Sequence, residues 1–277
     1  MAEGVKKCIH INGLDYACQF YGQDASLPYL LMLHGFMGDG RGFSHLVNDL
    51  TKSCNPITID LLGHGQTDKP VDPETYREKE QVDHLVALVN KIDKSPLFLY
   101  GYSMGGRLAL KTAQAAPNLF SGLILESTNP GLSDKKERAI RRDTDKERAS
   151  SIKNDFLAFL EKWEALPLFS SPAGLNSELS ELYKQIHAEQ EPEAMAAAIC
   201  GFSPGSMKPV TKKTQNYYHP VLLIAGSGDQ KYVTINKNME QLFPKARLSI
   251  LRAGHRVHMD NPDALGAEIN TFIEQNS

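Results

Sequence analysis

The stretch that decides the fold is LFLYGYSMGGR, residues 97–107. Its first half is an apolar run that predicts a buried strand, and the residues after Ser103 predict a helix. Between them, Gly101, Ser103 and Gly105 form the pattern G-x-S-x-G, in which small residues let the backbone reverse sharply and lift a serine hydroxyl above a sheet. An ordinary strand-to-helix turn is the alternative, but the context favours a turn that carries a nucleophilic serine.

The composition is that of a globular protein without a strong global charge. The residues are 41% hydrophobic and 23% charged, and the formal net charge is -3. No global field therefore favours nucleic acid, and no apolar run approaches the roughly 20 residues that span a bilayer. The four cysteines lack C-x-x-C spacing, which argues against a zinc site and a disulfide framework. We expect a cytoplasmic monomer or weak homo-oligomer that binds small molecules and neither nucleic acid nor membrane.

Short apolar runs recur along the chain and alternate with segments of helical character. The runs occupy residues 29–33, 56–60, 97–100, 122–125, 221–224 and 248–251. Continuous apolar strands separated by helices are typical of a parallel sheet covered on both faces, so we predict the α/β class. In such sheets ligands bind at the carboxyl ends of the strands, where the glycine-rich turns of this chain fall.

The alternation stops after Glu126. From there to about residue 213 the chain shows no strand pattern, but a charged run at 134–148, amphipathic stretches and several prolines. We predict a helical cap formed by residues 129–213, inserted into a core made of residues 1–128 and 214–277.

A serine hydroxyl reacts only when a histidine takes its proton and a carboxylate orients that histidine. On this kind of sheet the chain order is serine, acid, histidine, each at a strand end. Asp229 follows the apolar run that starts at Val221, and His255 follows the run that ends at Leu251. We therefore predict a catalytic triad of Ser103, Asp229 and His255.

Other residues compete for these roles. His258 lies three residues beyond His255 but has no glycine before it, and Glu126 also ends a strand. We expect Glu126 to make hydrogen bonds at the junction with the cap, and His34 and His64 to be structural turn residues.

A developing oxyanion needs hydrogen-bond donors aimed at it. The N–H of Met104, at the start of the predicted helix, can supply one of them. The loop HGFMG at residues 34–38 resembles the H-G-x-x-G loop that supplies the second donor, and we predict the N–H of Phe36 for that role.

Five motifs together resemble a known family, the α/β-hydrolase-fold synthases that make 2-succinyl-6-hydroxy-2,4-cyclohexadiene-1-carboxylate in menaquinone biosynthesis. They are LHGFMG at 33–38, DLLGHG at 60–65, GYSMGGR at 101–107, LESTNPGL at 125–132 and AGHRVH at 253–258. The resemblance implies a mostly parallel central sheet flanked by helices, with the cap inserted after the sixth strand. It also implies a lyase that eliminates pyruvate from 2-succinyl-5-enolpyruvyl-6-hydroxy-3-cyclohexene-1-carboxylate, without metal or cofactor.

The substrate of that family carries three carboxylates, which arginine binds through its two-pronged guanidinium. The resemblance points to Arg107 and Arg141 as its ligands, and to Tyr102 and Trp163 as pocket walls. Without it, Arg141 belongs to a mixed-charge run that is more often a solvated helix face. Lys231 resembles the lysine in the D-x-K pattern of the family. A role in positioning its loop is an equal alternative to a role in the site.

One departure concerns the second half of the cap, where many members of that family place a further arginine. Residues 182–195 offer only Lys184 and His187 as basic side chains, which puts the third carboxylate contact in doubt. A carboxylesterase or a carbon-carbon bond hydrolase with the same triad is the alternative enzyme. A non-catalytic receptor is a further alternative, against which the intact triad argues.

Overall fold

The computed structural model describes residues 4–172, 174, 176–211 and 218–277. An eight-stranded sheet forms its centre, with the strand order β1-β2-β4-β3-β5-β6-β7-β8. The strands are β1 (Val5–Ile11), β2 (Leu14–Phe20), β3 (Tyr29–Leu33), β4 (Asn55–Ile59), β5 (Leu97–Tyr102), β6 (Gly122–Glu126), β7 (Val221–Gly226) and β8 (Ala246–Leu251). From β4 to β8 all neighbours are parallel, which confirms the predicted α/β class.

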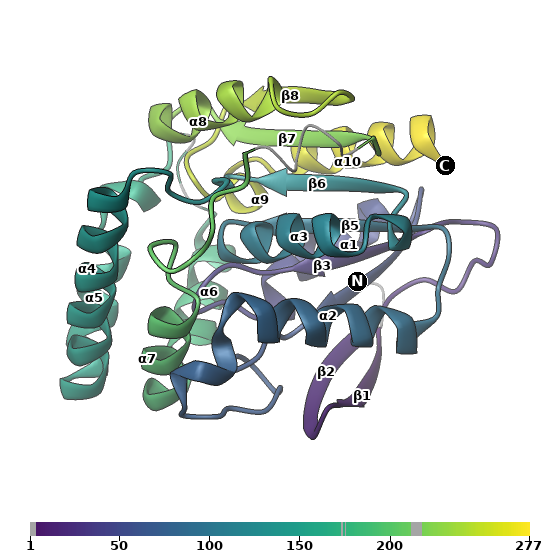
Figure 1. Cartoon of the computed structure of the whole chain (residues 1–277). Coiled ribbons are helices and arrows are strands. Elements are labelled where there is room, and N and C mark those ends of the chain that lie inside the picture. Colours follow the sequence, from purple (N-terminus) through teal and green to yellow (C-terminus); the bar gives the residue numbers. More distant parts are fainter. Residues whose placement is uncertain (1–3, 173, 175, 212–217) are drawn as a thin grey trace.

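Helices cover both faces of the sheet because its central strands are apolar on both sides. In β5, Leu97 and Leu99 pack into the apolar core on one face, whereas Phe98 and Tyr100 pack into the core on the other. The first face carries α2 (Glu78–Ile92), α3 (Met104–Ala115) and α8 (Gln230–Glu240), and the second carries α1 (Ser44–Leu50) and α10 (Pro262–Asn276). Figure 1 shows α2 and α3 in front of the sheet and α10 behind it.

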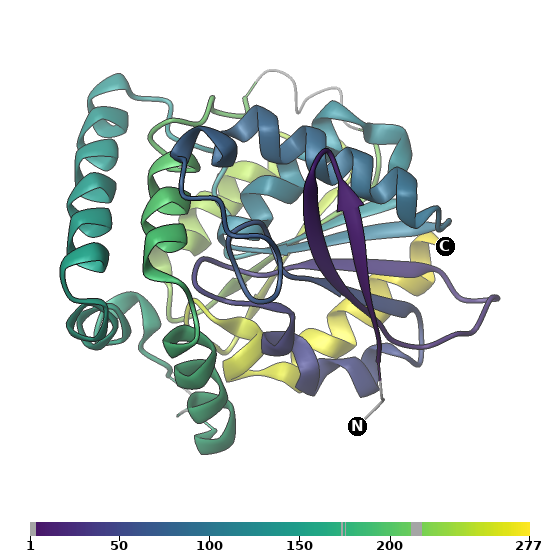
Figure 2. The same cartoon turned by 90° about the horizontal axis from the view of Figure 1, so that it is seen from below.

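The N-terminal hairpin of β1 and β2 was not among the predicted strands. Its turn is Asn12-Gly13, with φ of 49° and 87°, as the two-residue turn of an antiparallel hairpin requires. Most of β1 is exposed, and polar residues interrupt its apolar ones, so it gave no apolar run, although the Asn-Gly pair was a usable signal. Figure 2 shows the hairpin at the edge of the sheet, far from the cap helices.

Among the described residues, four α-helices lie between β6, the sixth strand, and β7: α4 (Lys135–Asn154), α5 (Phe156–Glu164), α6 (Ser177–Ala188) and α7 (Pro192–Gly201). The side chains of Asp134, Asp155 and Asn176 accept hydrogen bonds from first-turn amides of α4, α5 and α6, and Pro192 begins α7. These helices cover the carboxyl ends of the strands (Figure 1), and α7 lies between α4 and the core (Figure 2). We refer to them as the cap.

A separate apolar cluster joins the cap to the core. Met37, from the loop after β3, packs with Ile152, Phe159 and Met195 of three cap helices. The described part of the insertion contains no strand, in line with the prediction. The predicted boundary at residues 213 and 214 lies outside the described residues.

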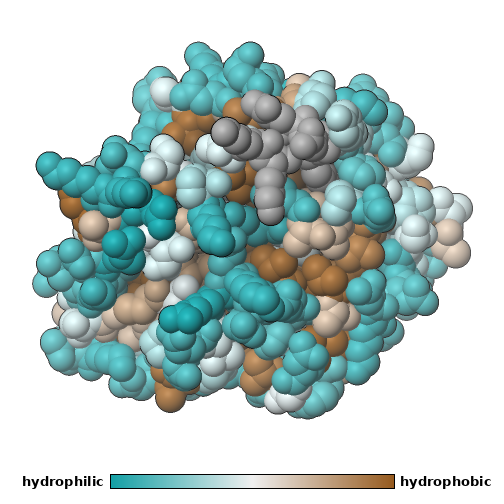
Figure 3. Space-filling model, in the orientation of Figure 1, coloured by the Kyte–Doolittle hydropathy of each residue, from teal (hydrophilic) through white to brown (hydrophobic). Residues whose placement is uncertain are grey.

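Short elements complete the described part of the chain. They are the 3-10 helices η1 (Gly40–Phe43), η2 (Pro73–Tyr76), η3 (Pro117–Leu119) and η4 (Pro167–Phe169), and the one-turn helix α9 (Val257–Asp260). Hydrophilic residues cover most of the face in Figure 3, with apolar patches between them. Within the described residues, no helix has the length and apolar character needed to cross a membrane.

Candidate active site

Ser103 lies on a sharp turn between β5 and α3. Its backbone has φ 50° and ψ −103°, outside the range that a side chain prefers, and its N–H donates to the carbonyl oxygen of Glu126 at 2.9 Å. The neighbouring glycines are required by close packing: a Cβ on Gly105 would come within 2.4 Å of the carbonyl oxygens of Leu33 and His34. The backbone strain at Ser103 is therefore held by the contact of α3 with the end of β3.

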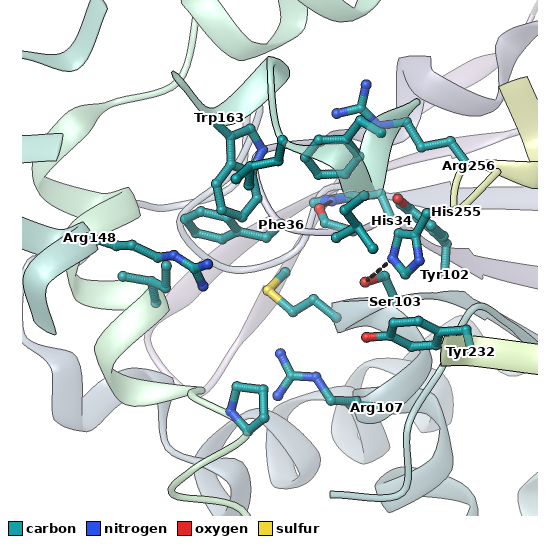
Figure 4. Close-up of a pocket in the computed structure, with 18 of the residues that line it drawn as sticks. His34, Phe36, Tyr102, Ser103, Arg107, Arg148, Trp163, Tyr232, His255 and Arg256 are labelled. Atoms are coloured by element: carbon teal, nitrogen blue, oxygen red, sulfur yellow. Dashed lines mark hydrogen bonds between the residues drawn. The ribbon is translucent and has the colours of Figure 1, made fainter. Parts of the chain in front are cut away.

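The structure brings the three predicted triad residues together (Figure 4). His255 Nε2 lies 3.2 Å from Ser103 Oγ, and His255 Nδ1 lies 2.7 Å from Asp229 Oδ2. Asp229 is itself fixed at the start of α8, where its other carboxylate oxygen accepts the N–H of Tyr232 at 3.2 Å. When Nδ1 donates to the carboxylate, Nε2 is free to accept the serine proton.

Aromatic rings shield this histidine from solvent. The rings of Tyr232, Tyr102 and Phe169 lie with centroids 4.5, 5.6 and 6.3 Å from that of His255. The His255 side chain is 1% exposed, so the hydrogen-bonded chain works in a low-dielectric environment.

The two predicted oxyanion donors face the same cavity. Met104 begins α3, and Phe36 lies in the loop after β3; both line the space in front of Ser103. Among the described residues neither backbone N–H has an acceptor within the protein. Both amides are thus available to a negatively charged oxygen.

The cavity has a volume of about 320 Å³, and its lining is rich in cations. Arg107, predicted as a ligand, is 7% exposed and donates to the carbonyl oxygen of Phe202 at 2.9 Å, with its guanidinium over the Phe202 ring. It has no carboxylate partner in the described part of the chain. Burial, together with the nearby charge of Arg141, lowers the pKa of Arg107 to about 10, so it is still charged at neutral pH.

Arg141 also lines the cavity, but it shares a carboxylate with an arginine that the sequence analysis missed. The fully buried Asp145 lies 2.8 Å from Arg141 Nε and 3.1 Å from Arg148 Nη1, and it accepts a third bond from Ser203. The spacing Arg141, Asp145, Arg148 places the three on one face of α4, which was a usable signal. Figure 4 shows the guanidinium groups of Arg148 and Arg107 pointing into the same space.

The remaining predicted lining residues are also at the cavity. Trp163 packs between the rings of Phe36, Phe159 and Phe169, and Tyr102 and Lys231 line other parts of the wall. Of the two basic residues in the second half of the cap, His187 lines the cavity, whereas Lys184 pairs with Glu181 on the surface. Tyr232 and Arg256 line it as well and were not among the predicted site residues.

Comparisons with known proteins agree with this architecture. Residues 28–262 match the family model described as alpha/beta hydrolase fold. A protein of Bacillus subtilis (strain 168) named as a 2-succinyl-6-hydroxy-2,4-cyclohexadiene-1-carboxylate synthase is 34% identical over 95% of this chain and 96% of its own length. This chain belongs to the alpha/beta hydrolase fold family, among those synthases.

Two further relatives give the same result. The synthase of that name from Serratia proteamaculans (strain 568) is 27% identical over 90% of this chain and 94% of its own. The solved structure of MenH from S. aureus has a TM-score of 0.87 and 33% identity, covering 94% of this chain and 98% of that one. An enol-lactonase from Burkholderia xenovorans LB400, with 16% identity, a TM-score of 0.81 and coverage of 97% and 100%, shares the fold alone.

Behind the site, this hydrolase-fold core contains a second buried acid and histidine. Glu126, which is fully buried, accepts bonds from Tyr100 and from the backbone N–H and Nδ1 of His258, the latter at 2.7 Å. His258 Nε2 bonds to Tyr183 of the cap helix α6. Both competitors for the triad are therefore engaged with each other, and Glu126 makes hydrogen bonds at the cap junction as predicted. His34 Nδ1 bonds to the carbonyl of Gly35 and His64 Nδ1 to that of Leu62, within their turns as predicted, and His34 Nε2 also accepts the N–H of Leu61 from the loop after β4.

We expect Glu126→Gln to lower the free energy of unfolding by about 3 kcal/mol, because the substitution takes the carboxylate charge away from the buried His258 that donates to it. Burial alone would raise the pKa of Glu126, but its bonds with His258 and Tyr100 outweigh burial and hold that pKa below its ordinary value. The stabilisation is then complete above the ordinary carboxyl pKa and is lost as the pH falls through the lower folded value. Denaturant unfolding at several pH values measures both effects. The exposed Glu181→Gln is the control, and equal stability of the two variants would contradict the prediction.

Proposed function

We propose that this protein eliminates pyruvate from 2-succinyl-5-enolpyruvyl-6-hydroxy-3-cyclohexene-1-carboxylate to give 2-succinyl-6-hydroxy-2,4-cyclohexadiene-1-carboxylate in menaquinone biosynthesis. One observation carries the proposal: the hydrogen-bonded residues Ser103, His255 and Asp229 lie beside a cavity lined by several arginines. A neutral ester would favour a mostly apolar lining, whereas this lining suits a substrate with several carboxylates. The synthases named among the relatives support the same reaction.

Substrate binding rests on the arginines around the cavity. Within the described ranges Arg107 lacks an acidic partner, and Arg141 and Arg148 share the single carboxylate of Asp145. These three guanidinium groups and Asp145 carry a net positive charge, so two substrate carboxylates can be neutralised there by charge-assisted hydrogen bonds. Trp163 and Tyr102 form walls against which the ring of the substrate packs.

The first chemical step is removal of a proton. His255, oriented by Asp229, takes the proton of Ser103, and the serine oxygen removes the acidic hydrogen alpha to the succinyl carbonyl. The electron pair of that C–H bond moves onto the carbonyl oxygen, and the resulting enolate is stabilised by the N–H groups of Phe36 and Met104.

The second step expels the leaving group. The enolate re-forms the carbonyl, its electrons shift through the ring double bond, and the bond between the remote ring carbon and the enolpyruvyl oxygen breaks. The enolpyruvate then takes a proton and becomes pyruvate. No acyl-enzyme forms in this sequence, and none of its steps needs a metal or cofactor. A cytoplasmic location and a monomeric or weakly associating state stay predictions.

We expect Ser103→Ala and His255→Ala each to lower kcat by about 10²- to 10⁴-fold, because proton transfer loses its base. Pyruvate release from the enolpyruvyl substrate, coupled to lactate dehydrogenase, measures the rate. Hydrolysis of p-nitrophenyl acetate is followed in parallel. Rapid ester turnover by the unaltered protein without pyruvate release would favour the carboxylesterase instead.

We expect Arg141→Ala to raise KM about tenfold with little change in kcat, because a charge-assisted bond to the substrate contributes about 1.5–3 kcal/mol. Arg142→Ala is a matched control: it lies next along α4 and is also half-buried, but it donates to the carbonyl of Gly205. The two variants are compared by steady-state kinetics of pyruvate release. If they have the same KM, Arg141 does not bind the substrate.

A further inference from the structure

Arg256, the residue after His255, joins the core to the cap. Its two terminal nitrogens donate to the two carboxylate oxygens of Glu164, at 3.0 Å each, and its side chain is only 8% exposed. Glu164 is the last residue of the cap helix α5. A two-pronged, mostly buried ion pair therefore connects the loop of the catalytic histidine to the cap.

Three cap elements converge on this pair. The guanidinium of Arg256 lies 3.8 Å from the ring centroid of Phe169 in η4 and 5.4 Å from that of Tyr183 in α6. His187 Nδ1 of α6 lies 2.7 Å from Glu164 Oε1, the oxygen that also accepts from Arg256 Nη2. Loss of the pair would thus remove the direct link between α5 and the histidine loop, while α6 keeps the bond of Tyr183 to His258 and η4 keeps the contact of Phe169 with His255.

The segment held in this way forms the wall over the triad. Trp163, adjacent to Glu164, packs against Phe169, with ring centroids 5.5 Å apart, and Phe169 packs against His255. Trp163, Phe169 and His255 all line the cavity. Figure 4 labels Trp163 and His255 there, together with Arg256. The position of this wall decides whether the proton transfer between Ser103 and His255 is closed to water.

Arg256 also differs electrostatically from the other arginines of the cavity. Both of its terminal nitrogens donate to Glu164, whose carboxylate matches its charge. In the part of the chain that the structure describes, Arg107 has no acidic partner, and Arg141 shares one with Arg148. A substrate carboxylate would have to displace Glu164 to reach Arg256. Arg256 is therefore better placed to connect the core to the cap than to bind a substrate carboxylate.

We propose that Arg256 and Glu164 form a clamp that holds the Trp163–Phe169 wall over His255, and that both are positioning residues for the elimination. The proposal deepens the proposed function and rests on it for its kinetic consequences. With the clamp broken, a smaller fraction of molecules has the cap in place. The apparent affinity for substrate falls by that fraction, while a bound substrate still holds the cap closed.

The test uses the full chain and two readouts. We expect Glu164→Gln to raise KM for pyruvate release about tenfold with kcat changed less than about threefold. Trp163 is the only tryptophan of the chain, so its fluorescence reports on the wall directly. Without substrate, its emission should shift to the red and its quenching by acrylamide should increase. Glu161→Gln, an exposed acid one turn earlier on α5, is the matched control.

The clamp is overturned if Glu164→Gln matches Glu161→Gln in either KM or acrylamide quenching. Arg256→Lys provides a second variant, since lysine keeps the charge but cannot donate two parallel bonds; it should move both readouts in the same direction. It also replaces Glu164→Gln if that variant does not fold. If the unaltered protein releases no pyruvate, the proposed function fails, and the quenching comparison alone decides the clamp.

Discussion

The site depends on one backbone constraint, the strained positive-φ conformation of Ser103 held by the packing of α3 against β3. Because a Cβ at Gly105 would clash with the carbonyls of Leu33 and His34, the helix starts at a fixed point and direction. That start places Met104, the first residue of α3, in the lining of the cavity. Arg107 lies four residues after Ser103, so it points from the same face of α3. A single turn thus places the proposed reactive oxygen, a proposed oxyanion donor and a cation that has no acidic partner among the described residues.

The second organising feature is an uneven distribution of charge between core and cap. The cap supplies Asp145 to two arginines and Glu164 to one, while Arg107 of the core has no acidic partner among the residues that the structure describes. A buried, unmatched guanidinium is tolerated here because the Phe202 carbonyl and ring partly replace its hydration. In this water-poor cavity an incoming carboxylate gains more from that charge than it would in bulk solvent. The cap therefore sets which cations are left for the substrate.

Most of the core could be predicted from the sequence, and the cap could be predicted only in outline. The buried parallel strands are apolar runs with clear ends, and the turn at Ser103 has a recognisable pattern, so the residues of the proposed triad followed from strand order. The hairpin of β1 was missed because an exposed edge strand needs no apolar face. Arg256 was missed for a different reason: its partner Glu164 is 92 positions away, and no local spacing encodes a contact between core and cap.

The same triad serves esterases and this proposed elimination, so the difference in chemistry has to come from what faces it. Ester hydrolysis needs a carbonyl carbon in line with the serine oxygen and then a water molecule to release the acyl group. In the proposed elimination, cations across the cavity would instead hold a polycarboxylate by its ends and leave an acidic C–H near Ser103. The Trp163–Phe169 wall lies against the ring of His255. In that proposal the core provides a general proton acceptor, and the cap would select elimination over hydrolysis by fixing the substrate and limiting water.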